Sequence, residues 1–582
     1  MLPVPTCAVP FTVHRVKGAR TLWINDEAMP ADEGWSDARF ADEFGFAVAD
    51  TPCFADVEFD RTVSKTLLAE RYGGFGTGNH GGGARAGGWE RFQLKGIGRN
   101  MLAAGGDGTI NGAFHSFGGF PLVDALCELV NSEVLSRVLP VGVVRCLGLV
   151  LTGERTAFYP QRADTAPSFG VILVREQCLR PAHFIRNGGF EVGADLLLTS
   201  GSDLTRLRTL CRGFQEALGG EKAFVAHLGK FLANSANQLA LARLFRISHG
   251  SLSPSNLATD GRWLDMMGSS LLPPGCDYAP APWVARFSGE PDLLKSVMVE
   301  WASTQAKFCG TDIATAPLLG YFDRQFGAYT KLHLPAFFGL PSRAIAACLD
   351  TPDGRALADA AGASVTDGLV LTDRLPLAYR HDRDPCLRLV RDLFLGEEGG
   401  GPAPPPIPAP VRRGFEALLG EAGAAAAGGR DPGRFRDEAM VAAMRRLHFS
   451  SFFYRGRLIG EASDVALSGD LRRVEPLIRG RLAAADWVFA PPEEEEDGRT
   501  IVDFGGVRIR LLADGSLLRD VRGDVGVLDG PGRFDAALRV IDAEGPALVA
   551  PALFGFPPVP PYDFGTGARE IIRALARAAS LR

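Results

Sequence analysis

The chain has 582 residues, 46% of them hydrophobic and 22% charged, a balance that excludes a mostly disordered protein. Its net charge of -6 argues against a general nucleic-acid-binding protein, because a polyanion is bound by an excess of basic side chains. Neither a signal peptide nor an apolar run long enough to span a bilayer is evident. We therefore expect a cytoplasmic protein with no membrane and no nucleic-acid partner.

The composition divides the chain into four parts. Residues 1–190 are glycine-rich with strand-like runs, and they are predicted to form an N-terminal lobe with nucleotide-binding loops. Residues 191–395 are predicted to form a helical C-terminal lobe that carries a metal-binding loop. Residues 396–432 are rich in Pro, Gly and Ala and predict a linker. Residues 433–582 are predicted to be an accessory C-terminal α/β region.

Apolar periodicity predicts the elements of the first two parts. Strand-like runs cover 91–95, 143–151 and 169–175, and helical spacing covers 121–139. Helical patterns then dominate, for example in 204–218 and 222–247. The ten cysteines form no CxxC pair and no zinc-finger spacing, so we expect free, buried thiols.

The last two parts are less regular. A short helix is expected inside the predicted linker, around 412–419, and helices are expected over 434–485. Turn signals and alternating residues predict short strands over 500–540, followed by a terminal helix over 568–582. The Phe- and Pro-rich segment 551–561 is either a packing strap or a surface for a protein partner.

A glycine-rich loop followed by a lysine is the first motif that predicts chemistry. The backbone N–H groups of residues 71–85 would approach phosphate oxygens, and Arg85 would grip those oxygens in a fork. Lys95 follows on an apolar strand, as in kinases, and Glu128 on a predicted helix is placed to pair with it. The structural alternatives are a flexible loop and a lysine that reaches solvent.

Two further segments offer groups that bind phosphate. Asp107 and Gly108 form a turn signal with an acid placed to hold a metal or a phosphate-binding loop. Arg175 and Arg186 flank a loop and would clamp the far end of a triphosphate. A surface turn and surface arginines are the alternatives for these segments.

The most specific motif is the segment 248–257, Ser-His-Gly-Ser-Leu-Ser-Pro-Ser-Asn-Leu, which is followed by Asp265. A histidine-led loop, an asparagine and a later aspartate are the pattern that kinases use to hold magnesium on a nucleotide. Asn256 and Asp265 supply hard oxygen ligands, which suit Mg²⁺. The alternative is an asparagine turn and an exposed aspartate.

In this order, the motifs resemble those of the selenoprotein O (SelO) family, whose members are kinase-fold protein adenylyltransferases that bind ATP in a reversed orientation and transfer AMP. The resemblance covers about residues 70–310. It rests on Tyr72-Gly-Gly-Phe-Gly-Thr-Gly-Asn-His-Gly-Gly, Gln93-Leu-Lys95-Gly-Ile-Gly98, Asp107-Gly108, Cys127-Glu128 and Val144-Arg-Cys-Leu-Gly.

The resemblance implies an α+β, two-lobed, protein-kinase-like fold and a site that binds ATP with Mg²⁺ or Mn²⁺. Lys95, braced by Glu128, would hold phosphates. The other residues implied in nucleotide binding are Gly82, Arg85, Asp107, Gly108, Arg175 and Arg186, and the implied metal ligands are Asn256 and Asp265.

The sequence departs from the family pattern at the position of the catalytic general base. The family loop reads His-Gly-x-x-Asn-Thr-Asp-Asn, and its aspartate, the expected general base, is Ser255 here. Ser251 occupies the place where aminoglycoside-type kinases have theirs. The spacing from lysine to glutamate and the spacing of the arginine pair are also wider than usual, and the family's C-terminal Cys motif is absent.

We therefore expect an adenylyltransferase whose acceptor, on a protein or peptide, needs no base. A carboxylate is already ionised at neutral pH, whereas a serine or tyrosine hydroxyl is not. Transfer of AMP to a carboxylate would give an acyl-adenylate. The alternatives are a catalytically inactive ATP-binding scaffold and a kinase-like phosphotransferase.

Overall fold

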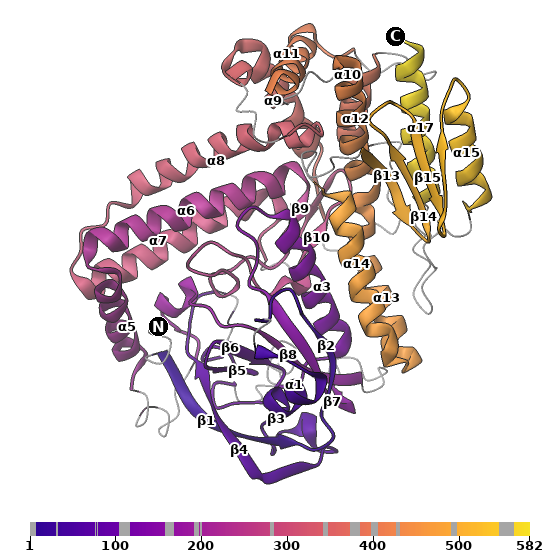
Figure 1. Cartoon of the computed structure of the whole chain (residues 1–582). Coiled ribbons are helices and arrows are strands. Elements are labelled where there is room, and N and C mark those ends of the chain that lie inside the picture. The colour runs from indigo at the N-terminus through magenta and orange to yellow at the C-terminus, as the bar shows by residue number, and fades with distance from the viewer. Residues whose placement is uncertain are drawn as a thin grey trace.

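The protein is described from a computed structural model and folds as a mixed α+β structure (Figure 1). The described residues are 7–30, 33–75, 77, 80–103, 117–157, 168–190, 197, 201–279, 284–341, 347–372, 384–396, 406–425, 431–490, 498–545 and 564–581. The Phe- and Pro-rich segment 551–561 lies outside them. No helix of the described residues is both long and apolar enough to cross a membrane.

An eight-stranded antiparallel sheet forms the N-terminal part, in the order β2-β7-β8-β6-β5-β4-β1-β3. Its strands are β1 (Ala8–Val16), β2 (Arg20–Ile24), β3 (Phe46–Ala47), β4 (Phe59–Glu70), β5 (Ala86–Trp89), β6 (Phe92–Lys95), β7 (Cys146–Ala157) and β8 (Ser168–Glu176). The three predicted strand-like runs correspond to β6, β7 and β8, and are therefore confirmed.

The two faces of this sheet pack against different helices, because successive side chains of a strand point to opposite faces. Leu94 of β6 joins the apolar cluster of Phe40 and Phe44 from α1 (Asp37–Phe44). Leu173 of β8 joins the cluster of Leu126 from α3 (Leu122–Val138), the helix predicted over 121–139. The face toward α3 is the face that carries Lys95.

A helical part follows the sheet, and in Figure 1 its long helices lie side by side above it. Its main helices are α5 (Asp203–Leu218), α6 (Glu221–Leu244), α7 (Glu290–Cys309), α8 (Thr315–Phe337) and α9 (Pro352–Thr366). The helices predicted over 204–218 and 222–247 are α5 and α6. The second ends earlier than predicted because Arg246 has a positive φ of 55° and the chain enters β9 (Ile247–Ser248).

Short strand pairs connect the helices of this part. β9 pairs with β10 (Ser270–Leu271), and the two strands enclose the loop that carries Asn256 and Asp265. β11 (Cys276–Tyr278) pairs in parallel with β12 (Val370–Thr372). The side chain of Trp301 is fully buried among the rings of Phe184, Phe214 and Phe231, which ties α7 to the end of the sheet region.

The predicted linker is not a linker throughout. Helix α10 (Pro385–Leu395) precedes it, and α11 (Ala409–Ala425) occupies much of it and packs on α9. The expected short helix is thus present and longer than predicted. Val411, Phe415 and Leu418 recur at helical spacing and are buried, so this alanine- and glycine-rich segment has an apolar face despite its composition.

The C-terminal region contains a helical layer and a small sheet. Its elements are α12 (Pro432–Phe449), α13 (Arg455–Ser468), α14 (Val474–Val488), β13 (Arg499–Phe504), β14 (Val507–Leu511), β15 (Leu517–Val521), β16 (Asp524–Leu528), α15 (Arg533–Ala543) and α17 (Phe564–Ser580). The strands predicted over 500–540 end at Leu528. The prediction of strands is wrong for the residues after Leu528, where α15 forms instead. Phe534, Ala537 and Ile541 have helical spacing, and the burial of their side chains stabilises this helix.

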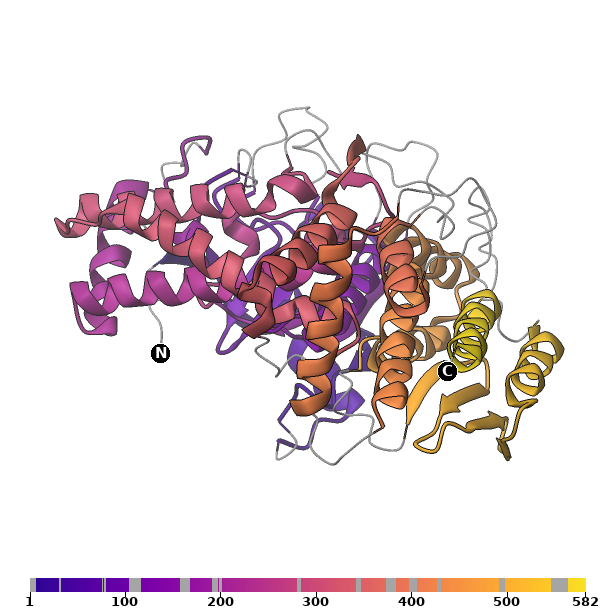
Figure 2. The same cartoon turned by 90° about the horizontal axis from the view of Figure 1, so that it is seen from above.

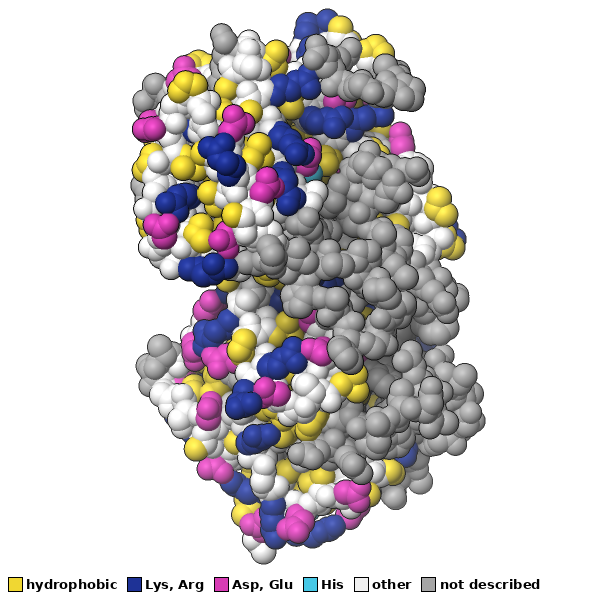
Figure 3. Space-filling model, turned by 90° about the vertical axis from the view of Figure 1, so that its right-hand side faces the viewer, with side chains coloured by type: hydrophobic (Ala, Val, Ile, Leu, Met, Phe, Trp, Pro, Cys, Tyr) yellow, Lys and Arg dark blue, Asp and Glu magenta, His cyan; other side chains and the backbone are white. Residues whose placement is uncertain are grey.

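This region is packed against the rest of the chain rather than separate from it. Helices α13 and α14 contact α3, and Figures 1 and 2 show them beside it. One apolar cluster runs from α3 through α12 to α17. Figure 3 shows basic and acidic side chains interspersed over the described surface of this side of the molecule. All ten cysteines are free and nine are buried, as predicted.

Candidate active site

The pleat of the sheet directs Lys95 toward α3. Gln93 and Lys95 are two residues apart on β6 and therefore share one face. The strand register places Arg175 of β8 opposite Gln93, so its side chain lies on the same face. Glu128 projects from α3 onto this face, and the four polar residues are each at most 4% exposed.

Glu128 binds two buried cations. The Nζ of Lys95 donates to Oε2 of Glu128 at 2.5 Å, and Nη1 of Arg175 donates to Oε1 at 2.6 Å. Arg175 also donates from Nε to Gln93 Oε1 at 2.7 Å. The expected pairing of Lys95 with Glu128 is therefore present. Arg175 braces the same carboxylate as Lys95, and its role at the far end of a triphosphate stays a prediction.

Replacing Glu128 by Ala is expected to lower the free energy of unfolding by about 3–5 kcal/mol, because Lys95 and Arg175 would lose the buried carboxylate that they share. Urea denaturation at neutral pH measures this loss. The matched control is Glu43→Ala, which removes the partner of Lys65 at a partly exposed site and should cost about 1 kcal/mol or less. Equal losses in the two variants would contradict the assignment.

The predicted metal ligands lie beside this pair. Oδ1 of Asp265 accepts from Lys95 Nζ at 3.0 Å, and the side chain of Asp265 is 28% exposed. Asn256 is held next to the segment that carries Asp265, because the backbone N–H of Leu264 donates to the carbonyl oxygen of Asn256 at 3.1 Å. The side-chain Nδ2 of Asn256 donates to the carbonyl oxygen of Ser251 at 2.8 Å. This bond directs Oδ1 of Asn256 away from Ser251 O.

Asp265 and Asn256 fit the chemistry of a magnesium site. Burial alone would raise the pKa of Asp265, but the charges of Lys95 and Arg175 outweigh burial and hold that pKa well below its usual value. Mg²⁺ takes hard oxygens and is typically held by one or two protein carboxylates together with substrate phosphates and water. No cluster of three or more His, Cys, Asp or Glu suited to a metal occurs among the described residues.

The loop that carries Asn256 has a fixed shape. Gly250 has a φ of +71°, and a Cβ there would lie 2.0 Å from the carbonyl oxygen of Gly268, so only glycine fits. Ser255 is buried, its Oγ lies 2.9 Å from Ser253 Oγ, and its carbonyl accepts from Arg180 at 2.8 Å. Position 255 thus carries a hydroxyl that is hydrogen-bonded to a second hydroxyl.

Arg180 is a site residue that the sequence analysis missed. It is 3% exposed and donates to Gln93 Oε1 at 2.9 Å, in addition to its bond to Ser255. Its guanidinium lies 5.3 Å from the ring centroid of Tyr72. The sequence signal is an arginine between Arg175 and Arg186, directly before a proline that begins a short helix. Arg180 connects the sheet to the loop.

A buried acid completes this network at the end of β4. Burial alone would raise the pKa of Glu70, but His183, whose Nε2 lies 3.4 Å from Oε2 of Glu70, and the charge of Arg180 outweigh burial and hold the pKa at about 2. Glu70 also accepts from Gln93 Nε2 at 2.8 Å. Burial lowers the pKa of His183, so this ring is neutral near pH 7. Charged and polar groups therefore run continuously from β4 to the loop.

The glycine-rich loop contributes Arg85 and Gly82. The guanidinium of Arg85 and the ammonium of Lys95 lie 5.0 and 4.7 Å from the ring centroid of Phe120, so two cations share one aromatic ring. Gly82 has a φ of +142°, and a Cβ there would lie 2.0 Å from the carbonyl oxygen of Glu70. Packing against β4 accounts for this glycine.

Arg186, a further predicted residue, does not join the cluster. Arg186 is exposed, and the ion pairs of Lys95 are with Glu128 and Asp265. The backbone of Arg186 instead lies where a Cβ on Gly73 would be, 2.4 Å from Arg186 C and O. Asp107 and Gly108 lie outside the described residues.

Glu290 stabilises the start of the loop that carries Asn256, by accepting hydrogen bonds from it. This buried residue at the start of α7 accepts from Ser248 Oγ and His249 N, each at 2.9 Å, and from Gly250 N at 3.3 Å. Burial raises the pKa of Glu290 to about 7, despite these bonds. The carboxyl group is therefore partly protonated near neutral pH.

Glu290 is expected to make the protein less stable as the pH rises. The folded-state pKa is raised, so this stability is fully present below the unfolded pKa of about 4.5 and is lost as the pH passes about 7. Between about pH 5 and pH 8 the loss should be roughly 2–3 kcal/mol. Urea unfolding of wild type and Glu290→Gln at both pH values measures it, since Gln cannot titrate. Parallel pH profiles would contradict the prediction.

The site thus combines Lys95, Glu128, Arg175, Arg180 and Asp265 from four separated segments of the chain. Its cations are buried or stacked on rings, and its exposed group is the Asp265 carboxylate. In comparisons with known proteins, no family model matches the chain, and no curated protein matches it.

Proposed function

We propose that the chain is a SelO-like, ATP-dependent nucleotidyltransferase that moves AMP onto a protein or peptide acceptor. The observation that carries the proposal is the position of Lys95, whose Nζ lies 2.5 Å from Glu128 and 3.0 Å from Asp265. A strand lysine that joins a helix glutamate to an acidic loop residue is typical of kinase-like nucleotide sites. A structural ion pair alone would not need the partly exposed Asp265.

The architecture agrees with a two-lobed, kinase-like arrangement. In this proposal the eight-stranded sheet with α3 is the first lobe, and helices α5 to α9 with the loop at 249–256 are the second. Lys95 and Glu128 come from the first lobe and Asp265 from the second. ATP would bind between them, with Lys95 and Arg85 near its phosphates and Asn256 and Asp265 as ligands of Mg²⁺, which would neutralise phosphate charge.

The transfer step is a displacement at the α-phosphorus of ATP. An acceptor oxygen forms the new P–O bond, the bond to the β-phosphate breaks, and pyrophosphate leaves with the electron pair. A hydroxyl acceptor must lose a proton in this step, whereas a carboxylate carries none at neutral pH. Because Ser255 replaces the expected base, we propose that the acceptor is a carboxylate and that the product is an acyl-adenylate.

Parallel incubations with α-labelled and γ-labelled ATP test the proposal. AMP transfer predicts label from the α-phosphate on protein, release of labelled pyrophosphate from γ-labelled ATP, and loss of the bound label in neutral hydroxylamine as a hydroxamate forms. Label from the γ-phosphate on protein would instead identify a phosphotransferase. Hydroxylamine-stable α-label would keep AMP transfer but exclude the carboxylate.

A non-catalytic ATP-binding protein is the second candidate. It is favoured by Ser255, whose hydroxyl is bonded to Ser253 rather than to a carboxylate. This candidate predicts that Mg-ATP raises the melting temperature of the wild type while neither label is transferred. Absence of both stabilisation and transfer would count against every nucleotide-based function.

A further inference from the structure

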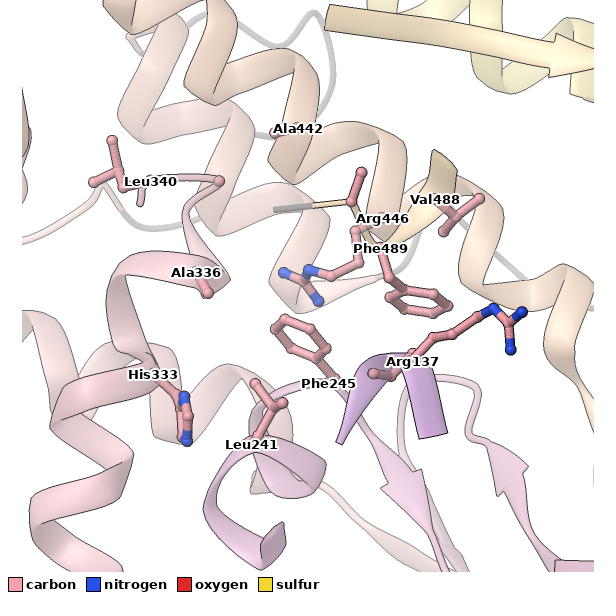
Figure 4. A pocket seen from close by; sticks show the side chains of 13 residues that line it. Arg137, Leu241, Phe245, His333, Ala336, Leu340, Ala442, Arg446, Val488 and Phe489 are labelled. Carbon is pink, nitrogen blue, oxygen red and sulfur yellow. The ribbon is translucent and has the colours of Figure 1, made fainter. Parts of the chain in front are cut away.

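A separate cavity lies where the C-terminal region meets the rest of the chain. Its volume is about 190 Å³, and it is enclosed by the ends of α3, α6, α8, α12 and α14 (Figure 4). Of the described residues that line it, none belongs to the cluster around Lys95. Phe245, Ala336 and Phe489 are half-buried, so the cavity is not sealed inside the core.

The walls of the cavity are apolar and partly aromatic. Phe245 and Phe489 contribute near-parallel rings, with centroids 6.3 Å apart and an angle of 22° between their planes. Leu241 and Val488 add aliphatic surface. Flat rings favour a ligand that is itself aromatic, because aromatic pairs attract each other beyond the area that they bury.

Arg446 brings a guanidinium group to the wall of the cavity. Arg446 of α12 is 6% exposed, its guanidinium carbon lies 4.2 Å from the centroid of Phe245, and it donates to Phe337 O at 2.8 Å. The second lining arginine, Arg137, points away in Figure 4 and pairs with Glu27 and Asp486. Among the described residues that line the cavity, none is acidic. A guanidinium beside an apolar wall is a typical partner for a carboxylate.

The volume limits the ligand. An apolar cavity of about 150 Å³ accommodates one benzene molecule, and drug-sized ligands need about 300 Å³ or more. The cavity therefore suits one ring with a small substituent. We propose that it binds a small, single-ring aromatic carboxylate, with the ring against Phe245 and Phe489 and the carboxylate at Arg446. This proposal does not depend on the proposed function.

Ligand-observed fluorine NMR with the full chain tests this site, with 4-fluorobenzoate as the probe. At millimolar concentration its signal should broaden, unlabelled benzoate should reverse the broadening, and Mg-ATP should not. The neutral match, 4-fluorobenzyl alcohol, should bind about tenfold more weakly, because it lacks a charge-assisted bond to Arg446. Absence of broadening, equal binding of both probes, or displacement by Mg-ATP would overturn the proposal.

Two variants locate the binding. Ala442→Met places extra volume in the cavity from α12 and should abolish binding of both probes, whereas Ala483→Met, on the exposed face of α14, should leave binding unchanged. Arg446→Met keeps the bulk and should remove the preference for the carboxylate. Thermal melts establish that each variant folds. Unchanged binding in Ala442→Met would overturn the proposal, and the comparison of the two probes on wild type holds without any variant.

Discussion

Replacing Lys95 by Met is expected to lower AMP transfer by about 10³-fold, the loss typical when one positioned donor to developing charge is removed. Lys95 is the cation that contacts both Glu128 and Asp265. Methionine keeps most of the buried volume, and Glu128 keeps its bond to Arg175, so the fold should persist. The effect is measured as the rate at which pyrophosphate is released from ATP, after the rate of background hydrolysis is subtracted.

The matched control is Lys65→Met. Lys65 lies on β4 of the same sheet and pairs with Glu43, away from the cluster around Asp265. Both variants should remain folded in thermal melts, with the larger drop in melting temperature for Lys95→Met because its ion pairs are buried, and the control should keep its transfer rate. Full activity in Lys95→Met would remove the observation on which the proposed function rests, whereas equal losses in the two variants would indicate a structural cause.

Replacing Ser255 by Asp is expected to raise AMP transfer to hydroxyl acceptors by about 10²–10⁴-fold, the contribution of a positioned general base. The residue lies beside Asn256, and its backbone carbonyl is held by Arg180, so a carboxylate there would be fixed in place. Transfer to carboxylates should be unchanged, because these acceptors are already ionised at neutral pH. Label from α-labelled ATP, divided into hydroxylamine-stable and hydroxylamine-labile fractions, separates the two.

Ser255→Asn is the control for this substitution, since it has the same size without the charge. It should give no increase in hydroxylamine-stable label. If Asp and Asn behave alike, position 255 does not hold a base in this protein. If the wild type already labels hydroxyls rapidly, another group accepts the proton and the carboxylate proposal is wrong.

The central part of the site could be predicted from local sequence motifs. A lysine on a strand after a glycine-rich loop, a helix glutamate and an asparagine followed by an aspartate were enough to expect Lys95, Glu128, Asn256 and Asp265 to meet. Each of these residues sits in a short segment whose type is evident from its neighbours. The ion pairs of Lys95 with Glu128 and Asp265 agree with that expectation.

The roles of the arginines could not be predicted in the same way. Arg175 was expected at a triphosphate, but the register of β6 against β8 sets it opposite Gln93 and against Glu128. Arg180 was overlooked, although it joins the sheet to the loop, because its partners Gln93 and Ser255 are 87 and 75 residues away in sequence. A long basic side chain reaches several directions, and only the packed neighbours decide among them.

The same division applies to the fold. The sequence alone determined where most helices and strands form, as for α3, α5 and β8, because the spacing of apolar residues follows the geometry of each element. Only the tertiary structure decided that 409–425 packs on α9, that α15 follows β16, and that α13 and α14 lie against α3. These contacts join surfaces far apart in the chain, and burial of one apolar face against another selects them without leaving a local signal.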